Sequence, residues 1–200
     1  MLPRPFPVWR WLVLPFVLML AAACTSSPSR EEQARELLER KRLVEIVRAS
    51  PATAMFLGQM DEVAFRNACI RGIAKGLTDE ELADALGFSR SELGAKEALF
   101  QEQIVRTSLF GQFPAEGDVA PARLNLAREL VAADPMADSM AERVRTGVAR
   151  SAAVAFTEDE LIQLLARARE PLAVSVQRKW PQIVSRAFQE LAQSGQKAKR

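Results

Sequence analysis

Hydrophobic residues recur three or four positions apart along most of the chain from Ser29 onward. Phe65, Cys69 and Ile73 follow one another at intervals of four, and Leu161 and Leu165 repeat that spacing. This period places apolar side chains on one face of a helix, and no segment shows the strict alternation of a half-buried strand. The pattern predicts an all-α fold.

Helix boundaries are marked by capping residues, prolines and glycines. Capping boxes are expected at Ser29–Glu32, Thr78–Glu81, Ser89–Glu92 and Thr157–Glu160, prolines at helix starts at Pro51, Pro135 and Pro171, and helix ends at Gly87, Gly111 and Gly195. The predicted helices are residues 29–48, 51–59, 62–76, 79–86, 90–110, 121–133, 135–155, 158–169 and 171–194. We expect a kink or a break at Pro181, inside the last helix.

The chain contains an internal repeat. Residues 64–110 align with residues 143–189 without a gap, and 12 of the 47 pairs are identical. Ordinary composition gives roughly one identity in fifteen. We therefore expect a duplication, with units at residues 30–112 and 113–195 packed as one helical bundle. The alternative is a chance alignment of Ala-rich helices.

The chain begins like a secretion signal. Arg4 and Arg10 precede an apolar run over residues 11–23, which is shorter than the about 20 residues that a membrane-spanning helix needs. The sequence Leu20-Ala-Ala-Ala-Cys24 resembles the lipobox of bacterial lipoproteins, with its Leu one position further from the Cys than is usual.

The lipobox resemblance implies that residues 1–23 are a lipoprotein signal peptide and that Cys24 carries acyl chains such as palmitate, which hold the protein in the membrane. Residues 24–29 then form a short polar tether. In enterobacterial lipoproteins an Asp after the Cys favours the inner membrane; Thr25 stands there, so we expect the outer membrane, with the protein facing the periplasm. The alternative is cleavage after Ala23 without acylation, which leaves a soluble periplasmic protein.

The charge balance bears on the partners of the chain. Removing Arg4 and Arg10 with the leader leaves 25 of the 27 bases against 25 acids. Without a surplus of bases, no binding to nucleic acid is expected. The chain has no His, which excludes His-based triads and His-ligated zinc. The basic tail, residues 196–200, is expected to be solvated; the alternative is contact with anionic lipid heads.

Two acidic runs, Asp79–Glu81 and Glu158–Glu160, are the candidates for a metal site or an acid–base pair. Both lie in a predicted first helical turn, where acids stabilise the positive end of the helix dipole. We therefore expect no metal, no cofactor and no catalytic residue. Without its leader the chain has one Trp, Trp180, no Tyr and no Gly-x-Ser-x-Gly elbow, so neither a peptidoglycan-cleaving enzyme nor any other enzyme is expected.

The second unit carries a recurring motif: Phe156-Thr-Glu-Asp-Glu-Leu161, then Pro171-Leu-Ala and Pro181 inside a long helix. It resembles a bacterial family of secreted domains of unknown function, and residues 78–94 are a looser second match. The usual aromatic-Ser-Pro turn is replaced by Arg169-Glu-Pro. The resemblance covers much of each repeat copy and implies an all-helical fold without a known activity.

Two apolar features of the sequence concern the core and a candidate binding site: Cys69 and a stripe near the end of the chain. Cys69, the only thiol besides Cys24, corresponds to Val148 in the repeat, so we expect it in the core. An apolar stripe near the end of the chain is the candidate binding site. It consists of Trp180, Pro181, Ile183, Val184 and Phe188. Core packing is one interpretation, and a groove for a partner helix or a lipid tail is the other.

These features predict an envelope-anchored helical protein that acts as a protein-binding or scaffold module for an unidentified envelope protein. The first alternative is a carrier or sensor of an apolar or lipid ligand bound between helices. A further alternative is a tethered inhibitor or immunity protein.

Overall fold

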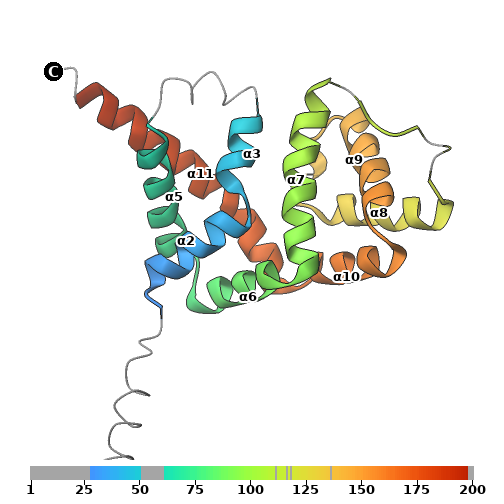
Figure 1. Ribbon diagram of the computed structural model, residues 1–200, viewed down its shortest axis with the longest axis horizontal. Helices are drawn as coiled ribbons and strands as arrows, with labels where there is room; N and C mark the ends of the chain where they lie inside the picture. The colour runs from blue at the N-terminus through green and yellow to red at the C-terminus, as the bar shows by residue number, and fades with distance from the viewer. Residues whose placement is uncertain are drawn as a thin grey trace, which may run out of the picture.

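All regular structure in the described part of the chain is helical (Figure 1). The computed structural model describes residues 28–50, 61–110, 112–115, 117, 119–135 and 137–197. The helices are α2 (Arg30–Arg40), α3 (Leu43–Ala49), α5 (Glu62–Gly76), α6 (Asp79–Arg90), α7 (Glu92–Phe110), α8 (Pro121–Ala133), α9 (Glu142–Ala155), α10 (Glu158–Ala168) and α11 (Pro171–Lys197). The all-α prediction is confirmed. The leader, Cys24, the predicted helix 51–59 and residues 198–200 lie outside the described residues.

Helix starts largely follow the predicted caps. Three of the four capping boxes are present, at Ser29, Thr78 and Thr157. The fourth prediction is wrong, because Ser89 is buried inside α6 and donates its hydroxyl to a carbonyl of the same helix. The residue that caps α7 is instead Ser91, which directly precedes the helix and whose hydroxyl accepts a hydrogen bond from the Gly94 N–H at 3.0 Å.

Two long predicted helices are shorter in the structure. The segment 29–48 is interrupted at Arg42, whose φ of 51° is left-handed. The Arg42 guanidinium donates to Glu102 at 2.6 Å, and this contact stabilises a turn that L-residues otherwise avoid. The segment 135–155 becomes a short 3-10 helix at Ala137–Ser139, followed by α9.

Three predicted helix breakers do not end a helix, and one of them, Gly195, lies inside α11, which continues to Lys197. Gly87 lies exposed inside α6, which continues to Arg90. Pro181 lies inside α11, which is assigned as one helix of 27 residues, so the structure has a continuous helix where a break was one of the two expectations. A proline inside a helix costs about 3 kcal/mol, and the apolar face that α11 packs against α5 offsets this cost.

Buried side chains form two separate cores. The first core lies among α2, α3, α5 and α6 and includes Val176, Ile183 and Ala187 of α11. The second core lies among α8, α9 and α10, and Leu93 and Phe100 of α7 pack against it. Each core is therefore completed by the long last helix of the other sequence unit. In Figure 1, α11 runs diagonally beside α5, whereas α7 stands next to α9.

Matching ion pairs fasten the two exchanged helices. Glu81, in the capping box of α6, accepts hydrogen bonds from Lys179 and Ser175 of α11, each at 2.6 Å. Glu160, in the capping box of α10, accepts a hydrogen bond from Lys96 of α7 at 2.7 Å. In both cases a carboxylate that starts a helix in one unit is bound by the long helix of the other.

The helix boundaries recur along the chain. The sequence repeat relates the first residues of α6 and α7 to the first residues of α10 and α11, and the last residue of α5 to the last residue of α9. The boundaries thus agree with the sequence repeat, and the origin of the repeat by duplication stays a prediction.

Candidate binding cleft between the two long helices

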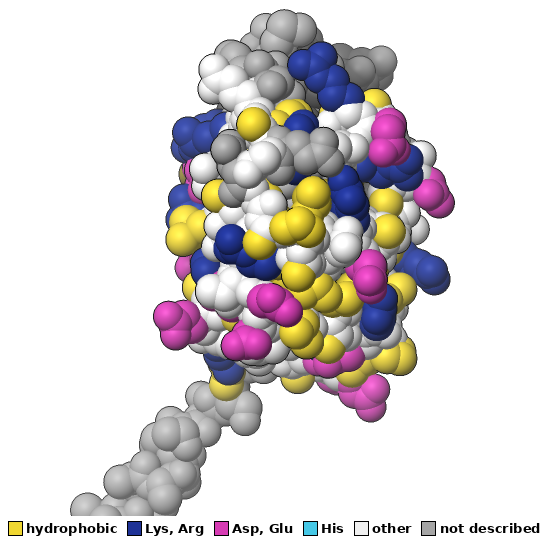
Figure 2. Space-filling view, turned by 90° about the vertical axis from the view of Figure 1, so that its right-hand side faces the viewer, with side chains coloured by type: hydrophobic (Ala, Val, Ile, Leu, Met, Phe, Trp, Pro, Cys, Tyr) yellow, Lys and Arg dark blue, Asp and Glu magenta, His cyan; other side chains and the backbone are white. Residues whose placement is uncertain are grey.

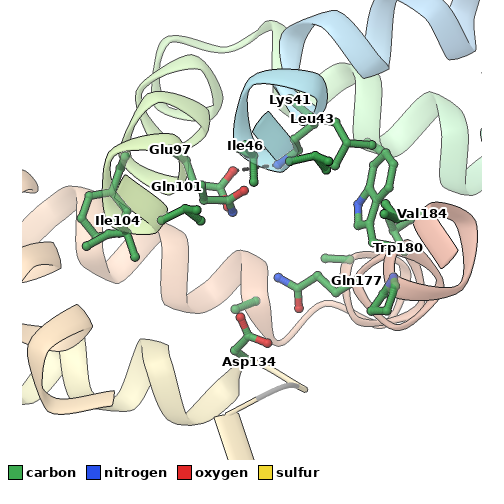
Figure 3. A pocket seen from close by; sticks show the side chains of 18 of the residues that line it. Lys41, Leu43, Ile46, Glu97, Gln101, Ile104, Asp134, Gln177, Trp180 and Val184 are labelled. Atoms are coloured by element: carbon green, nitrogen blue, oxygen red, sulfur yellow. Dashed lines mark hydrogen bonds and ion pairs between the residues drawn. The ribbon is translucent and has the colours of Figure 1, made fainter. Parts of the chain in front are cut away.

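A cleft of about 1250 Å³ lies between the two cores. Helix α7 forms one wall, α11 forms the facing wall, and α3, α8 and α10 contribute further side chains. Most of the lining is apolar, including Ile46, Phe100, Leu130 and Leu164. Figure 3 shows the opening between the α7 side chains and those of α11.

The two long walls use equivalent positions of the repeat. Glu97, Gln101 and Val105 of α7 line the cleft at intervals of four. The repeat relates them to Val176, Trp180 and Val184 of α11, which line it from the other side. The α7 residues were not among the predicted site residues, although the Gln-Ile-Val run that recurs in both long helices was a signal for them.

Four of the five residues of the predicted stripe line the cleft: Trp180, Pro181, Val184 and Phe188. Three of them, Trp180, Val184 and Phe188, also pack against the first core with their other side, and Phe188 contacts Phe65 with 4.9 Å between ring centroids. Ile183 points away from the cleft and is buried in the first core. Core packing and cleft lining thus coexist on one helix.

The cleft lies where α7 and α9 pack less tightly than the related pair of helices, α11 and α5. Gly72 and Gly76 of α5 bring α11 so close that a Cβ on Gly72 would lie 3.0 Å from Cγ2 of Ile183. The residue related to Ile183 is Ile104, which is only half-buried and lines the cleft. Cys69 and Val148 differ in the same way, since Cys69 is fully buried and Val148 lines the cleft.

One ion pair crosses the cleft near its rim. Lys41, at the end of α2, donates to Glu97 of α7 at 2.7 Å, and each side chain is 17% exposed (Figure 3). The Lys41 ammonium also lies 5.3 Å from the centroid of Phe88. This pair connects the first core to the helix that completes the second.

A second cation in the lining is also paired. Arg167 of α10 donates to Asp84 of α6 at 2.8 Å and lies 5.2 Å from the centroid of Phe88. The hydrogen bond to Asp84 raises the pKa of Arg167 above its usual value, although burial acts in the opposite direction. Arg167 thus remains charged and engaged within the protein.

Neutral and acidic groups complete the polar part of the lining. The amide of Gln177 and the carboxylate of Asp134 both point into the opening in Figure 3. The Gln177 Oε1 atom is buried and has no hydrogen-bond partner in the described part of the chain. Gln101 differs, because its amide nitrogen donates to Glu97 at 2.7 Å.

The two acidic runs lie where the sequence analysis placed them, in the first turns of α6 and α10. In each run one carboxylate closes the capping box and binds a lysine of the opposite long helix. Burial would raise the pKa of Glu81, but hydrogen bonds from Lys179, Ser175 and Thr78 lower it to about 2. Within the described residues, no three potential ligands are grouped in a way that could hold a metal ion.

The thiol of Cys69 is buried, as expected from its apolar counterpart in the repeat. Burial, together with the negative charge of Glu190, raises the pKa of Cys69 to about 12. The thiol therefore carries almost no thiolate at neutral pH and has little reactivity.

The surface outside the cleft carries no comparable feature on the side shown in Figure 2, where acidic and basic side chains are interspersed with hydrophobic ones. Among the described residues, the exposed large hydrophobic side chains are those of Val63, Leu99, Val154, Ile162 and Leu172, which belong to five different helices. Among the helices of the described residues, none combines the length and the apolar character that crossing a membrane requires.

Comparisons with protein-family models, with curated proteins and with solved structures found no match. The cleft and its chemistry are therefore the features of the molecule that bear on its function.

Proposed function

We propose that the protein is an envelope-tethered binding protein that holds the apolar chain of a lipid-like ligand in the cleft between α7 and α11. The observation that carries the proposal is the cleft itself, with its volume of about 1250 Å³ and a predominantly apolar lining. Pockets for drug-sized ligands usually measure roughly 300–1,000 Å³. The cleft is larger, which suits a long acyl chain.

The lining favours an apolar occupant energetically. Burial of apolar surface contributes about 25 cal/mol per Å², and Ile104, Val148 and Val184 are only half-buried in the cleft walls. An acyl chain that packs against these three side chains would remove their surface from water. Because the side chains and the acyl chain are apolar, no hydrogen bond would be lost in this contact. The expected acylation of Cys24 supports the proposal because it would hold the cleft next to a membrane, where such chains are abundant.

Trp180 provides a direct test, because it is the only Trp expected in the mature chain and it lines the cleft. The protein is purified without its leader and Cys24 and titrated with two probes that share a dibrominated stearoyl chain: the monoacylglycerol and the free fatty acid. Bromine quenches indole fluorescence only at short range. We expect saturable quenching of Trp180 by at least one probe.

Two variants of α7 form a matched pair for this titration. Ile104→Glu places a charge in the cleft wall, and we expect it to weaken binding at least about tenfold, because burying an unpaired charge is costly. Leu99→Glu is on the same helix, but Leu99 is 55% exposed and does not line the cleft, so binding should not change. If neither probe quenches the unaltered protein, the proposal is wrong.

A second candidate function is the protein-binding module expected from the sequence. Exposed residues such as Gln101, Ser185 and Gln189 line the cleft and leave it open along one edge. Its α11 wall extends from Ala173 to Ala192, about 28 Å at 1.5 Å per residue. An amphipathic helix of a partner could lie along this edge. A photo-cross-linker at Ser185, used in cells, would then capture one defined protein and no lipid.

A further inference from the structure

The charges that line the cleft do not favour an anionic ligand. Among the described lining residues the cations are Lys41 and Arg167, and both are engaged in ion pairs, with Glu97 and Asp84 respectively. The lining also contains the carboxylates of Glu97 and Asp134. A carboxylate or phosphate head would therefore find no uncommitted cation among these lining residues.

The amide of Gln177 marks the place where a polar group of the ligand can bind. It projects from α11 into the opening beside Asp134 (Figure 3), and its buried oxygen has no partner in the described part of the chain. A buried polar atom without a partner is unfavourable, because it has lost its hydrogen bonds to water without gaining one in the protein. The last torsion of a Gln side chain is soft, so the amide can turn this oxygen toward the cleft.

A hydroxyl group is the complement of this amide. It both donates and accepts hydrogen bonds, so it can donate to the unpaired Gln177 oxygen or accept from the amide N–H, and it carries no charge that needs a cation. A carboxylate only accepts hydrogen bonds, so it cannot pair with the Gln177 oxygen, and its charge would find no uncommitted cation among the described lining residues.

We infer that the ligand is a neutral, hydroxyl-bearing lipid of the acylglycerol type, whose head hydrogen-bonds to Gln177 while its chain lies along α7 and α11. This inference rests on the proposed function and specifies the class of ligand. It predicts a preference for the neutral head over the free fatty acid with the same chain.

The test compares the two dibrominated probes at pH 8, where the fatty acid is ionised. We expect the monoacylglycerol to bind the unaltered protein at least about fivefold more tightly. Gln177→Leu should weaken binding of the monoacylglycerol about two- to tenfold, the range for one lost hydrogen bond, and leave the fatty acid unchanged. Gln103→Leu is the matched control, because Gln103 is exposed on α7 and does not line the cleft, and it should keep the preference.

Gln177→Glu keeps the size and the acceptor oxygens and serves if the Leu variant does not fold. It should still bind the monoacylglycerol and bind the fatty acid more weakly than the unaltered protein does. Equal affinity for the two probes, or a preference that survives Gln177→Leu, overturns the inference while quenching itself still supports the proposed function. Absence of quenching by both probes would instead refute the proposed function.

Discussion

At the scale of single residues, two glycines inside helices differ in whether the structure leaves room for a side chain. A Cβ on Gly94 would lie 2.1 Å from the carbonyl oxygen of Phe88, whereas a Cβ on Gly87 would meet nothing within 4 Å. Gly94→Ala should therefore lower the free energy of unfolding by about 3 kcal/mol, because backbone atoms cannot move aside cheaply. Gly87→Ala should raise it by about 0.5–1 kcal/mol through helix propensity. Urea unfolding followed by circular dichroism measures both, and equal effects would contradict the close approach at Gly94.

The reactivity of Cys69 is a second prediction at this scale. With the pKa raised to about 12 by burial and by the Glu190 charge, only about one thiol in ten thousand is ionised at pH 8. In the chain without Cys24, iodoacetamide should alkylate Cys69 roughly a thousandfold more slowly in the folded protein than in urea. Mass spectrometry over time gives both rates. Rapid alkylation of the folded protein would show that the thiol is accessible.

At the scale of helices, the junction between α6 and α11 depends on one carboxylate. Glu81 is 5% exposed and binds Lys179, which is 32% exposed. Glu81→Gln should lower the free energy of unfolding at pH 7 by about 1–3 kcal/mol, because the ammonium of Lys179 loses its charged partner. Glu80 lies in the first turn of the same helix but is exposed. Glu80→Gln should therefore change the free energy of unfolding by less than about 0.5 kcal/mol. Urea titrations of both variants make the comparison.

The same carboxylate sets a dependence on pH. Its pKa in the folded protein is about 2, below the ordinary value of 4.5, so its ionised form stabilises the fold. This contribution is fully present above pH 4.5 and is lost as the pH falls through about 2. Between these values, unfolding experiments should show a shallower loss of stability for Glu81→Gln than for the unaltered protein. Parallel curves would mean that Glu81 does not stabilise the junction.

At the scale of the whole molecule, the exchange of long helices should hold the two halves together without a continuous chain. Residues 112–115 connect α7 to the second half in an irregular segment. If a protease site is placed there and cut, the two pieces should still elute together from a sizing column, because Ile183 and Ala187 of α11 are buried in the first core and Phe100 of α7 packs against the second. The uncut protein on the same column gives the elution volume expected of the intact pair. Separation of the pieces after the first cut would contradict the exchange.

The positions of the helices and most of their starts follow from the sequence alone. Periodic apolar residues and local hydrogen bonds specify these features, so Thr78 and Thr157 cap helices as expected. The sequence also indicated that Trp180 belongs to a candidate binding surface and that Cys69 is buried. It did not reveal the turn at Arg42, because a left-handed residue there depends on Glu102, 60 positions away.

Which core each long helix packs against, and therefore where the cleft lies, depends on packing in three dimensions. Ile104 and Ile183 occupy equivalent positions of the sequence repeat. In the structure, however, Ile104 lines the cleft, whereas Ile183 is buried in the first core. The difference arises from Gly72 and Gly76, which let α11 approach α5 closely. Close packing depends on the shapes of both partners in space, and periodicity along one chain reports only which face of a helix is apolar.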